Sequence, residues 1–122
     1  FTALESQLKD VKGISVIPQP INKYLYSSHY CQAVLLDENL VKKRPGIMKI
    51  LGEQGIGSSV YYPQPVPRMR FYQEKYGYEE NRYPNATRIS DGMLALPVGP
   101  HLNTQDMEII GKELTKIMKG LT

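Results

Sequence analysis

The chain has 122 residues, 41% of them hydrophobic and 22% charged, which is the balance of a single globular domain and excludes fibrous and disordered classes. Its net charge of +3 comes from 15 basic and 12 acidic residues that are interleaved along the chain. This weak basic charge is compatible with a phosphorylated ligand but is smaller than that of typical nucleic-acid-binding domains. Cys31 is the only cysteine and the longest aliphatic run covers only residues 33–36, so we expect a reducing, cytoplasmic setting, no internal disulfide and no membrane segment.

The first third of the chain predicts one helix and two strands. Residues 1–11 carry apolar side chains at helical spacing and end at Gly13, which predicts the tail of a longer helix that enters from upstream. Residues 14–17 are β-branched and predict a short strand. Residues 28–36 predict the main strand, with its end buried on both faces.

The middle of the chain predicts alternating helices and strands. Charged residues 37–44 predict a turn, and Pro45 suits the first turn of a helix with an apolar stripe. The glycines at 52, 55 and 57 match neither the dinucleotide fingerprint nor a phosphate loop, and they indicate a helix end and a tight turn. We expect a strand over 57–62, helices over 69–76 and 83–93, and a strand over 94–97.

The closing helix is strongly indicated. Asn103 or Thr104 caps it, acidic residues follow in its first turns and lysines lie near its end, matching the helix dipole. Its predicted buried stripe consists of Met107, Ile110, Leu114, Ile117 and Leu121. The whole pattern predicts an α/β domain of the α+β kind, with a sheet of three or four strands covered by helices.

The stretch from Val60 to Arg68 contains prolines at 63, 65 and 67, each of which fixes φ and pushes the preceding residue out of the helical region. It is therefore expected to be stiff, extended and on a surface. Tyr61, Tyr62 and Arg68 then form a preordered loop that can contact a ligand. Composition alone favours a plainer interpretation, a polyproline connector whose rings cover the core.

Side chains for catalysis or metal binding are sparse. His29 and Cys31 share a strand face, but two ligands are too few for zinc, and no nucleophile elbow or paired acid and base stands out. We assign no catalytic and no metal residue. Residues 61–83 interleave aromatic rings with lysines and arginines, so a free-standing module that binds nucleic acid or another polyanion is the alternative hypothesis.

Several motifs, taken in order from Val16 onward, resemble the C-terminal small domain of the DegT/DnrJ/StrS sugar aminotransferases, fold-type-I enzymes that use pyridoxal phosphate. The matching stretches are His29-Tyr30 with the strand that follows, Arg44, residues 55–57 leading into residues 60–65, Tyr83-Pro84-Asn85-Ala86, residues 94–100, and the helix after Leu102-Asn103-Thr104.

The resemblance implies a two-domain enzyme, usually a homodimer, that moves an amino group from an amino acid, commonly glutamate, to a keto group on a nucleotide-linked sugar. Residues 1–12 would be the end of an interdomain helix and residues 13–122 the small domain. The cofactor lysine and most cofactor contacts belong to a large domain that lies outside this chain, so no cofactor-binding residue is assigned here. This fragment alone is expected to be inactive.

In that family a His-Tyr-Pro-x-Pro-x-His loop of the small domain lies near the sugar. Here the loop has Tyr61 in place of the first histidine and Pro67 in place of the second. A phenol keeps a hydrogen-bonding group but does not change charge near neutral pH, so an acid–base role at this position would be lost. The resemblance places Tyr61, Tyr62 and Arg68 at the substrate edge, and it implies neither a nucleic-acid nor a membrane partner.

Overall fold

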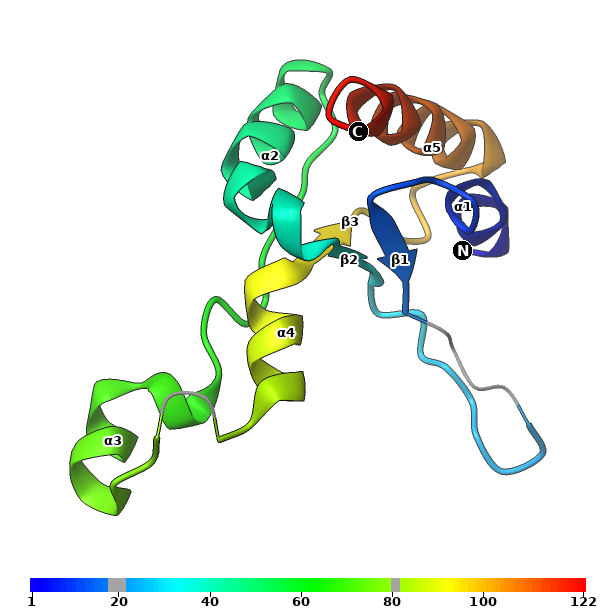
Figure 1. Ribbon diagram of the computed structural model, residues 1–122. Helices are drawn as coiled ribbons and strands as arrows, with labels where there is room; N and C mark the ends of the chain where they lie inside the picture. Colours follow the sequence, from blue (N-terminus) through cyan, green and yellow to red (C-terminus); the bar gives the residue numbers. More distant parts are fainter. Residues whose placement is uncertain (18–21, 80–81) are drawn as a thin grey trace.

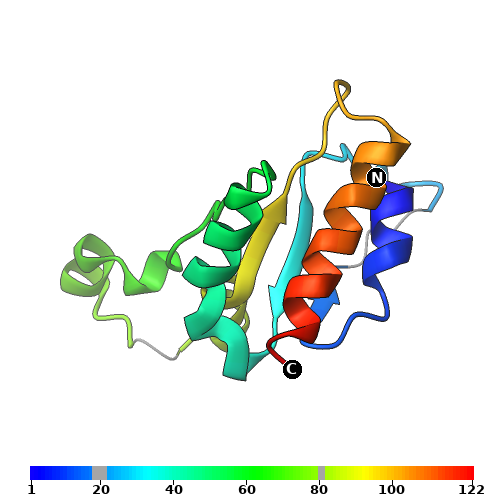
Figure 2. The same ribbon diagram turned by 90° about the horizontal axis from the view of Figure 1, so that it is seen from above.

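The computed structural model describes residues 1–17, 22–79 and 82–122. Three strands form an antiparallel sheet in the order β1-β2-β3, and three helices, α1, α2 and α5, cover one of its faces (Figures 1 and 2). The helix α4 lies on the other side of the sheet, and α3 stands apart from the core at the end of a long connection (Figure 1). The predicted α/β fold with a small helix-covered sheet is therefore confirmed, with three strands.

The chain runs through the following elements: α1 (Thr2–Leu8), β1 (Ile14–Val16), β2 (Gln32–Leu36), η1 (Glu38–Lys43), α2 (Arg44–Glu53), η2 (Val66–Arg68), α3 (Arg70–Tyr76), α4 (Pro84–Gly92), β3 (Met93–Leu96) and α5 (Thr104–Lys119), where η denotes a 3-10 helix.

The central strand β2 has the two-sided burial that its sequence predicts. Val34 and Leu36 are fully buried in the helix-covered core, while Ala33, on the opposite face, is only 8% exposed. The strand is shorter than predicted, because it begins at Gln32 rather than at residue 28. His29 has a φ of 50° and its backbone N–H donates to Ser27 Oγ, so a local turn replaces the extended backbone there.

The helix α5 follows its sequence signals closely. Asn103 Oδ1 accepts hydrogen bonds from the backbone N–H groups of Gln105 and Asp106, and Asp106 Oδ2 accepts one from Asn103 N at 2.8 Å. This capping box satisfies N–H groups that the first helical turn leaves without partners. The predicted stripe is buried from Met107 to Ile117 and also includes Gly111 and Met118, whereas Leu121 lies beyond the helix and is partly buried.

The predicted strand over 57–62 is wrong. Ser59 makes a single bridge to Ala95, with N···O distances of 3.1 and 2.9 Å, and the pairing stops on both sides. In this antiparallel register the next hydrogen-bonded pair of residues would be Gly57 and Pro97, and Pro97 has no N–H to donate. In the other direction the chain enters the proline-rich stretch and leaves the sheet.

The proline-rich stretch is not extended throughout, contrary to prediction. Pro65 is extended, but Val66–Arg68 forms the 3-10 helix η2, closed by hydrogen bonds from Arg68 N to Pro65 O and from Met69 N to Val66 O. Pro67 is tolerated because the N–H that it lacks would be unpaired in the first turn of a helix. The rings do not cover the core either, since Tyr61 is 41% and Tyr62 is 66% exposed. The connector interpretation, which composition favoured, is therefore wrong for these two side chains.

Candidate functional site

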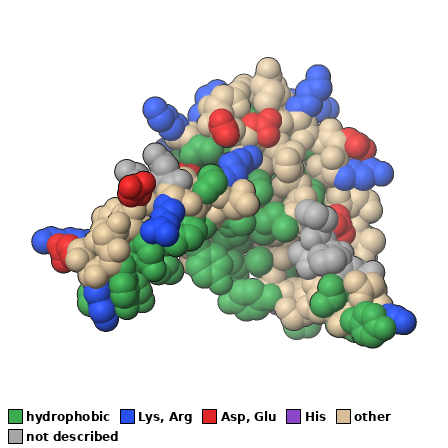
Figure 3. Space-filling model, turned by 60° about the horizontal axis from the view of Figure 1, so that its bottom comes forward, with side chains coloured by type: hydrophobic (Ala, Val, Ile, Leu, Met, Phe, Trp, Pro, Cys, Tyr) green, Lys and Arg blue, Asp and Glu red, His purple; other side chains and the backbone are tan. Residues whose placement is uncertain are grey.

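The face of the sheet opposite α1, α2 and α5 carries many hydrophobic side chains at the surface (Figure 3). Two loops bring aromatic rings together on this side. Tyr30, just before β2, stacks on Tyr61 with 5.4 Å between ring centroids and 29° between ring planes. The stack fixes the orientation of Tyr61 although both rings remain exposed to solvent.

Tyr30 and Tyr61 line a shallow depression of about 330 Å³, together with Ser59, Ala95 and Pro97. The bridge between Ser59 and Ala95 anchors this depression to the sheet, while its aromatic wall is exposed. The lining combines two aromatic rings with serine and tyrosine hydroxyls, so it offers both apolar contact and hydrogen bonds to a small molecule. Of the three residues predicted at the substrate edge, the structure brings Tyr61 to this depression, and Tyr62 and Arg68 lie outside its lining.

Arg68 is held by a carboxylate of α4. Its Nη1 donates to Asp91 Oδ1 at 2.7 Å and its Nη2 donates to Asp91 Oδ2 at 3.1 Å. The side chains of Arg68 and Asp91 are 24% and 34% exposed, so water screens the pair only in part. Such a bidentate ion pair has a fixed geometry, and it links the end of the proline-rich stretch to α4.

Arg44 strengthens the same corner of the molecule. Its Nη1 donates to the backbone oxygens of Ser90 at 2.8 Å and Met93 at 3.1 Å, which places a cation at the C-terminal end of α4. The hydrogen bond from Arg68 lowers the pKa of Asp91, burial acts in the opposite direction, and the charges of Arg68 and Arg44 lower the pKa further. Asp91 is therefore ionised at neutral pH. Its carboxylate is hydrogen-bonded to Arg68 and is also stabilised by the charge of Arg44.

We expect the Arg68–Asp91 pair to contribute to stability in a pH-dependent way. The pKa of Asp91 is lower in the folded chain than in the unfolded one, so the contribution is fully present above the ordinary aspartate pKa of about 4 and is lost as the pH falls through the folded-state value. Asp91→Asn should lower the free energy of unfolding by about 0.5–1 kcal/mol near neutral pH. Urea denaturation at about pH 7 and about pH 2 measures this difference, which should shrink in acid.

A matched control is Glu74→Gln. Glu74 pairs with Arg70 on α3, but these side chains are 63% and 90% exposed, so water screens the pair and little change is expected at either pH. An equal loss of stability for Asp91→Asn at both pH values would contradict the assigned role of the Asp91 charge.

The aromatic residues around α3 form a row of ring contacts. Phe71 meets Tyr72 edge-on, Tyr72 stacks on Tyr76 with 6.1 Å between centroids, and Tyr78 continues the row to Tyr83. These are rings that the polyanion hypothesis requires for base stacking, and they also contact one another. Phe71 and Tyr76 are more than half exposed, so the apolar side of α3 does not pack on the core. Residues 80 and 81 of this region lie outside the described residues.

Metal ligands do not gather anywhere in the described ranges, which hold no group of three or more His, Cys, Asp or Glu side chains placed to bind an ion. The ring of His29 packs against Phe1 with 4.5 Å between centroids, and burial raises the pKa of the Cys31 thiol. None of the helices found in residues 1–17, 22–79 and 82–122 is long and apolar enough to cross a bilayer.

Sequence reasoning missed Tyr30 and Asp91 as members of this region. The sequence indicates Tyr30 only as part of the strand pattern and of the His29-Tyr30 stretch of the resemblance, and its partner Tyr61 is 31 positions away (61 − 30 = 31). Asp91 is 23 positions from Arg68, a separation that no local spacing rule connects. The only signal available for this corner was the family resemblance, which included Arg44.

One protein family matches most of the chain. The model of the DegT/DnrJ/EryC1/StrS aminotransferase family matches residues 1–115. EryC1, the erythromycin biosynthesis sensory transduction protein of Saccharopolyspora erythraea, is 30% identical over 101 residues, which are 83% of this chain and 25% of EryC1.

Two solved structures have the same fold. The putative sugar aminotransferase Spr1654 of Streptococcus pneumoniae, in its PLP-form, superposes with a TM-score of 0.81 and 19% identity, covering 99% of this chain and 30% of Spr1654. DesI, solved in the presence of its TDP-sugar product, gives a TM-score of 0.76 and 20% identity, covering 96% of this chain and 29% of DesI. The chain thus spans less than a third of these relatives. Because the family model covers all but the last seven residues (122 − 115 = 7), the chain belongs to the DegT/DnrJ/EryC1/StrS aminotransferase family.

Proposed function

We propose that this chain is the C-terminal small domain of a pyridoxal-phosphate-dependent enzyme that transfers an amino group from an amino acid, glutamate, to a keto group on a nucleotide-linked sugar. The observation that carries the proposal is the family match over residues 1–115. It is supported by relatives of the same fold, one solved in a PLP-form and one with a TDP-sugar product. A reducing, cytoplasmic setting and a homodimeric enzyme are parts of the same proposal.

The cofactor belongs, in this proposal, to a large domain outside the chain. Pyridoxal phosphate requires a lysine amine beside its ring, and the depression formed by Tyr30 and Tyr61 includes no lysine in its lining. The residues described do not fit the cofactor there, so no chemical step is assigned to them. Residues 1–12, which contain α1 (Thr2–Leu8), would end an interdomain helix, and residues 13–122 would form the small domain. By itself the chain is expected to be inactive.

The role proposed for this chain is to form one edge of the sugar site. Tyr61 would offer a hydroxyl and an apolar ring, oriented by its stack on Tyr30. Tyr62, which is 66% exposed, would add a second ring beside it. Arg68 would contact the substrate only at the rim, since Asp91 already holds both of its Nη atoms; its main effect would be to position the loop.

Tyr61→Phe tests the substrate edge in the longer protein that contains this chain. The change removes the hydroxyl but keeps the ring that stacks on Tyr30, so only a hydrogen bond to the sugar is lost. One such bond corresponds to an increase of about 2- to 10-fold in the KM for the sugar substrate, with the KM for glutamate unchanged. Tyr76→Phe, on α3, is the matched control. An unaltered sugar KM would remove Tyr61 from the site.

The function as a whole is tested by purifying that longer protein. It should carry pyridoxal phosphate, visible as its absorption band, and should convert more than one equivalent of glutamate to its keto acid only when a nucleotide-linked keto sugar is supplied. Transfer of the amino group is then measured on the sugar by mass spectrometry. A protein that purifies without the cofactor and does not take it up would overturn the proposal.

A further inference from the structure

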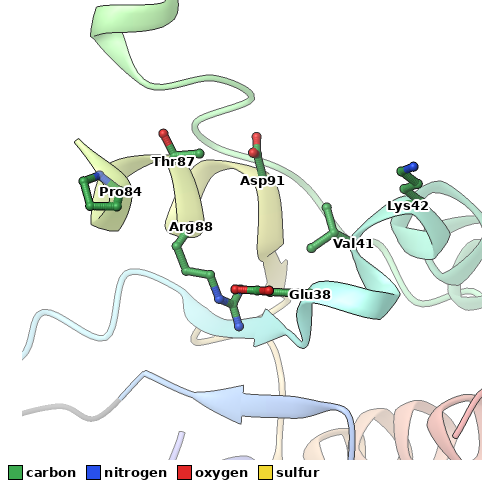
Figure 4. Close-up of a pocket in the computed structure, with 7 residues that line it drawn as sticks. All are labelled: Glu38, Val41, Lys42, Pro84, Thr87, Arg88 and Asp91. Atoms are coloured by element: carbon green, nitrogen blue, oxygen red, sulfur yellow. The ribbon is translucent and has the colours of Figure 1, made fainter. Parts of the chain in front are cut away.

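A second pocket, of about 460 Å³, lies between η1 and α4, next to the Arg68–Asp91 pair (Figure 4). Its wall from η1 consists of Glu38, Val41 and Lys42, and its wall from α4 includes Thr87, Arg88 and Asp91. In Figure 4, Arg88 extends from α4 toward η1 in the middle of this group, with Pro84 at one end and Lys42 at the other. The function proposed above makes no use of this pocket.

Arg88 is the unusual group in this pocket. The side chain of Arg88 is only partly exposed, and its Nη1 is buried without an acceptor from any residue in the described ranges. The guanidinium passes over Gly92, where an added Cβ would overlap with Nη1 and would lie 3.3 Å from Leu36 O. Burial of Nη1 fixes the guanidinium in place, so an acceptor in the pocket could reach only the other nitrogens of this side chain, which belongs to the pocket lining.

The charges around the pocket select the kind of acceptor. Both oxygens of Asp91 are taken by Arg68, which leaves Arg88 and Lys42 against the single carboxylate of Glu38. The net charge of these three side chains is one positive charge, so the pocket favours an anion. A carboxylate matches the planar fork of a guanidinium, and a second carboxylate on the same ligand can meet Lys42. Val41 and Pro84 supply apolar walls for a short hydrocarbon chain.

We propose that the pocket between η1 and α4 binds a short aliphatic carboxylate. The carboxylate pairs with the guanidinium of Arg88, the hydrocarbon chain lies against Val41 and Pro84, and Lys42 accommodates a second carboxylate where the ligand has one. The inference rests on the pocket and its charges alone, and it stands whether or not the chain belongs to a sugar aminotransferase.

Titration of the isotopically labelled chain with glutarate tests the proposal by NMR. Glutarate should shift the amide signals of residues 38–42 and 84–91 in a saturable way, with a Kd of roughly 1–10 mM for so small a ligand. Glutaramide has the same length without charge and should give no saturable shift. Arg88→Gln should weaken glutarate binding by about 10- to 100-fold, the value of a charged hydrogen-bonded pair. Arg70→Gln, an exposed arginine on α3, is the matched control and should bind as the original chain does.

Three results would overturn the proposal: no saturable shift with glutarate, equal binding of glutaramide, or unchanged binding by Arg88→Gln. If Arg88→Gln alters the fold, Arg88→Lys keeps the charge but removes the planar fork, and binding as tight as the original by this variant would also count against the assigned contact. The last test repeats the glutarate titration on the longer protein that contains this chain. Glutarate that binds the chain but not the longer protein would show that another part of the protein fills the pocket, and a small ligand would then be excluded.

Discussion

Replacing Gly13 by alanine is expected to lower the free energy of unfolding by about 2–5 kcal/mol. Gly13 connects α1 to β1 with a φ of +86°, a conformation that an L side chain adopts only with strain. An added Cβ would also lie 2.7 Å from Leu40 Cδ1, 2.7 Å from Met118 Cε and 2.9 Å from Thr122 Cγ2. The three atoms are the ends of side chains that can shift, but Leu40 and Met118 are fully buried, so their displacement disturbs core packing and adds to the backbone strain.

Gly55→Ala separates these two effects. Gly55 also has a positive φ, +76°, but an added Cβ there would meet no heavy atom within 4 Å among the residues placed in the structure. Its loss of stability should be about 1–2 kcal/mol, the strain alone. Thermal and urea denaturation of both variants measure the difference. Equal losses for Gly13→Ala and Gly55→Ala would mean that the core around Gly13 relaxes without cost.

Replacing Gln32 by leucine is expected to raise the free energy of unfolding by about 1–3 kcal/mol. Gln32 is the first residue of β2, it is fully buried, and neither Oε1 nor Nε2 has a hydrogen-bond partner in the described part of the chain. The side chain shares a strand face with Val34 and lies opposite Leu96, so leucine has an apolar environment of suitable size. Urea denaturation measures the gain.

Gln32→Glu is the matched control, because it keeps the shape of the side chain and introduces a carboxyl group. Burial of that group without a partner should destabilise the chain by several kcal/mol, or keep the carboxyl protonated well above its ordinary pKa. A loss of stability in Gln32→Leu would be the contrary result. It would show that the amide has a partner, such as a buried water or a group outside this chain.

The elements with strong local signals were predictable. The capping residue Asn103 and the apolar spacing through Ile117 specify α5, and the aliphatic run at residues 33–36 specifies the buried part of β2. Predictions failed where a distant residue decides the outcome. The strand expected at 57–62 is reduced to one bridge because its partner would include Pro97, 40 positions from Gly57 (97 − 57 = 40). Composition could not predict the positions of the Tyr61 and Tyr62 rings, because it does not determine which part of the surface remains exposed to solvent.

By itself the sequence determined the α/β class, the order and type of most elements, and the family, since hydrophobic periodicity, helix caps and turn residues act over a few neighbouring positions. Only the tertiary structure decided that Tyr30 stacks on Tyr61, that Asp91 holds Arg68, and that Arg88 faces η1 across a pocket. Each of these contacts joins residues that are remote in the chain. Their energies depend on distance and burial, and both arise only when the sheet and its helices pack together.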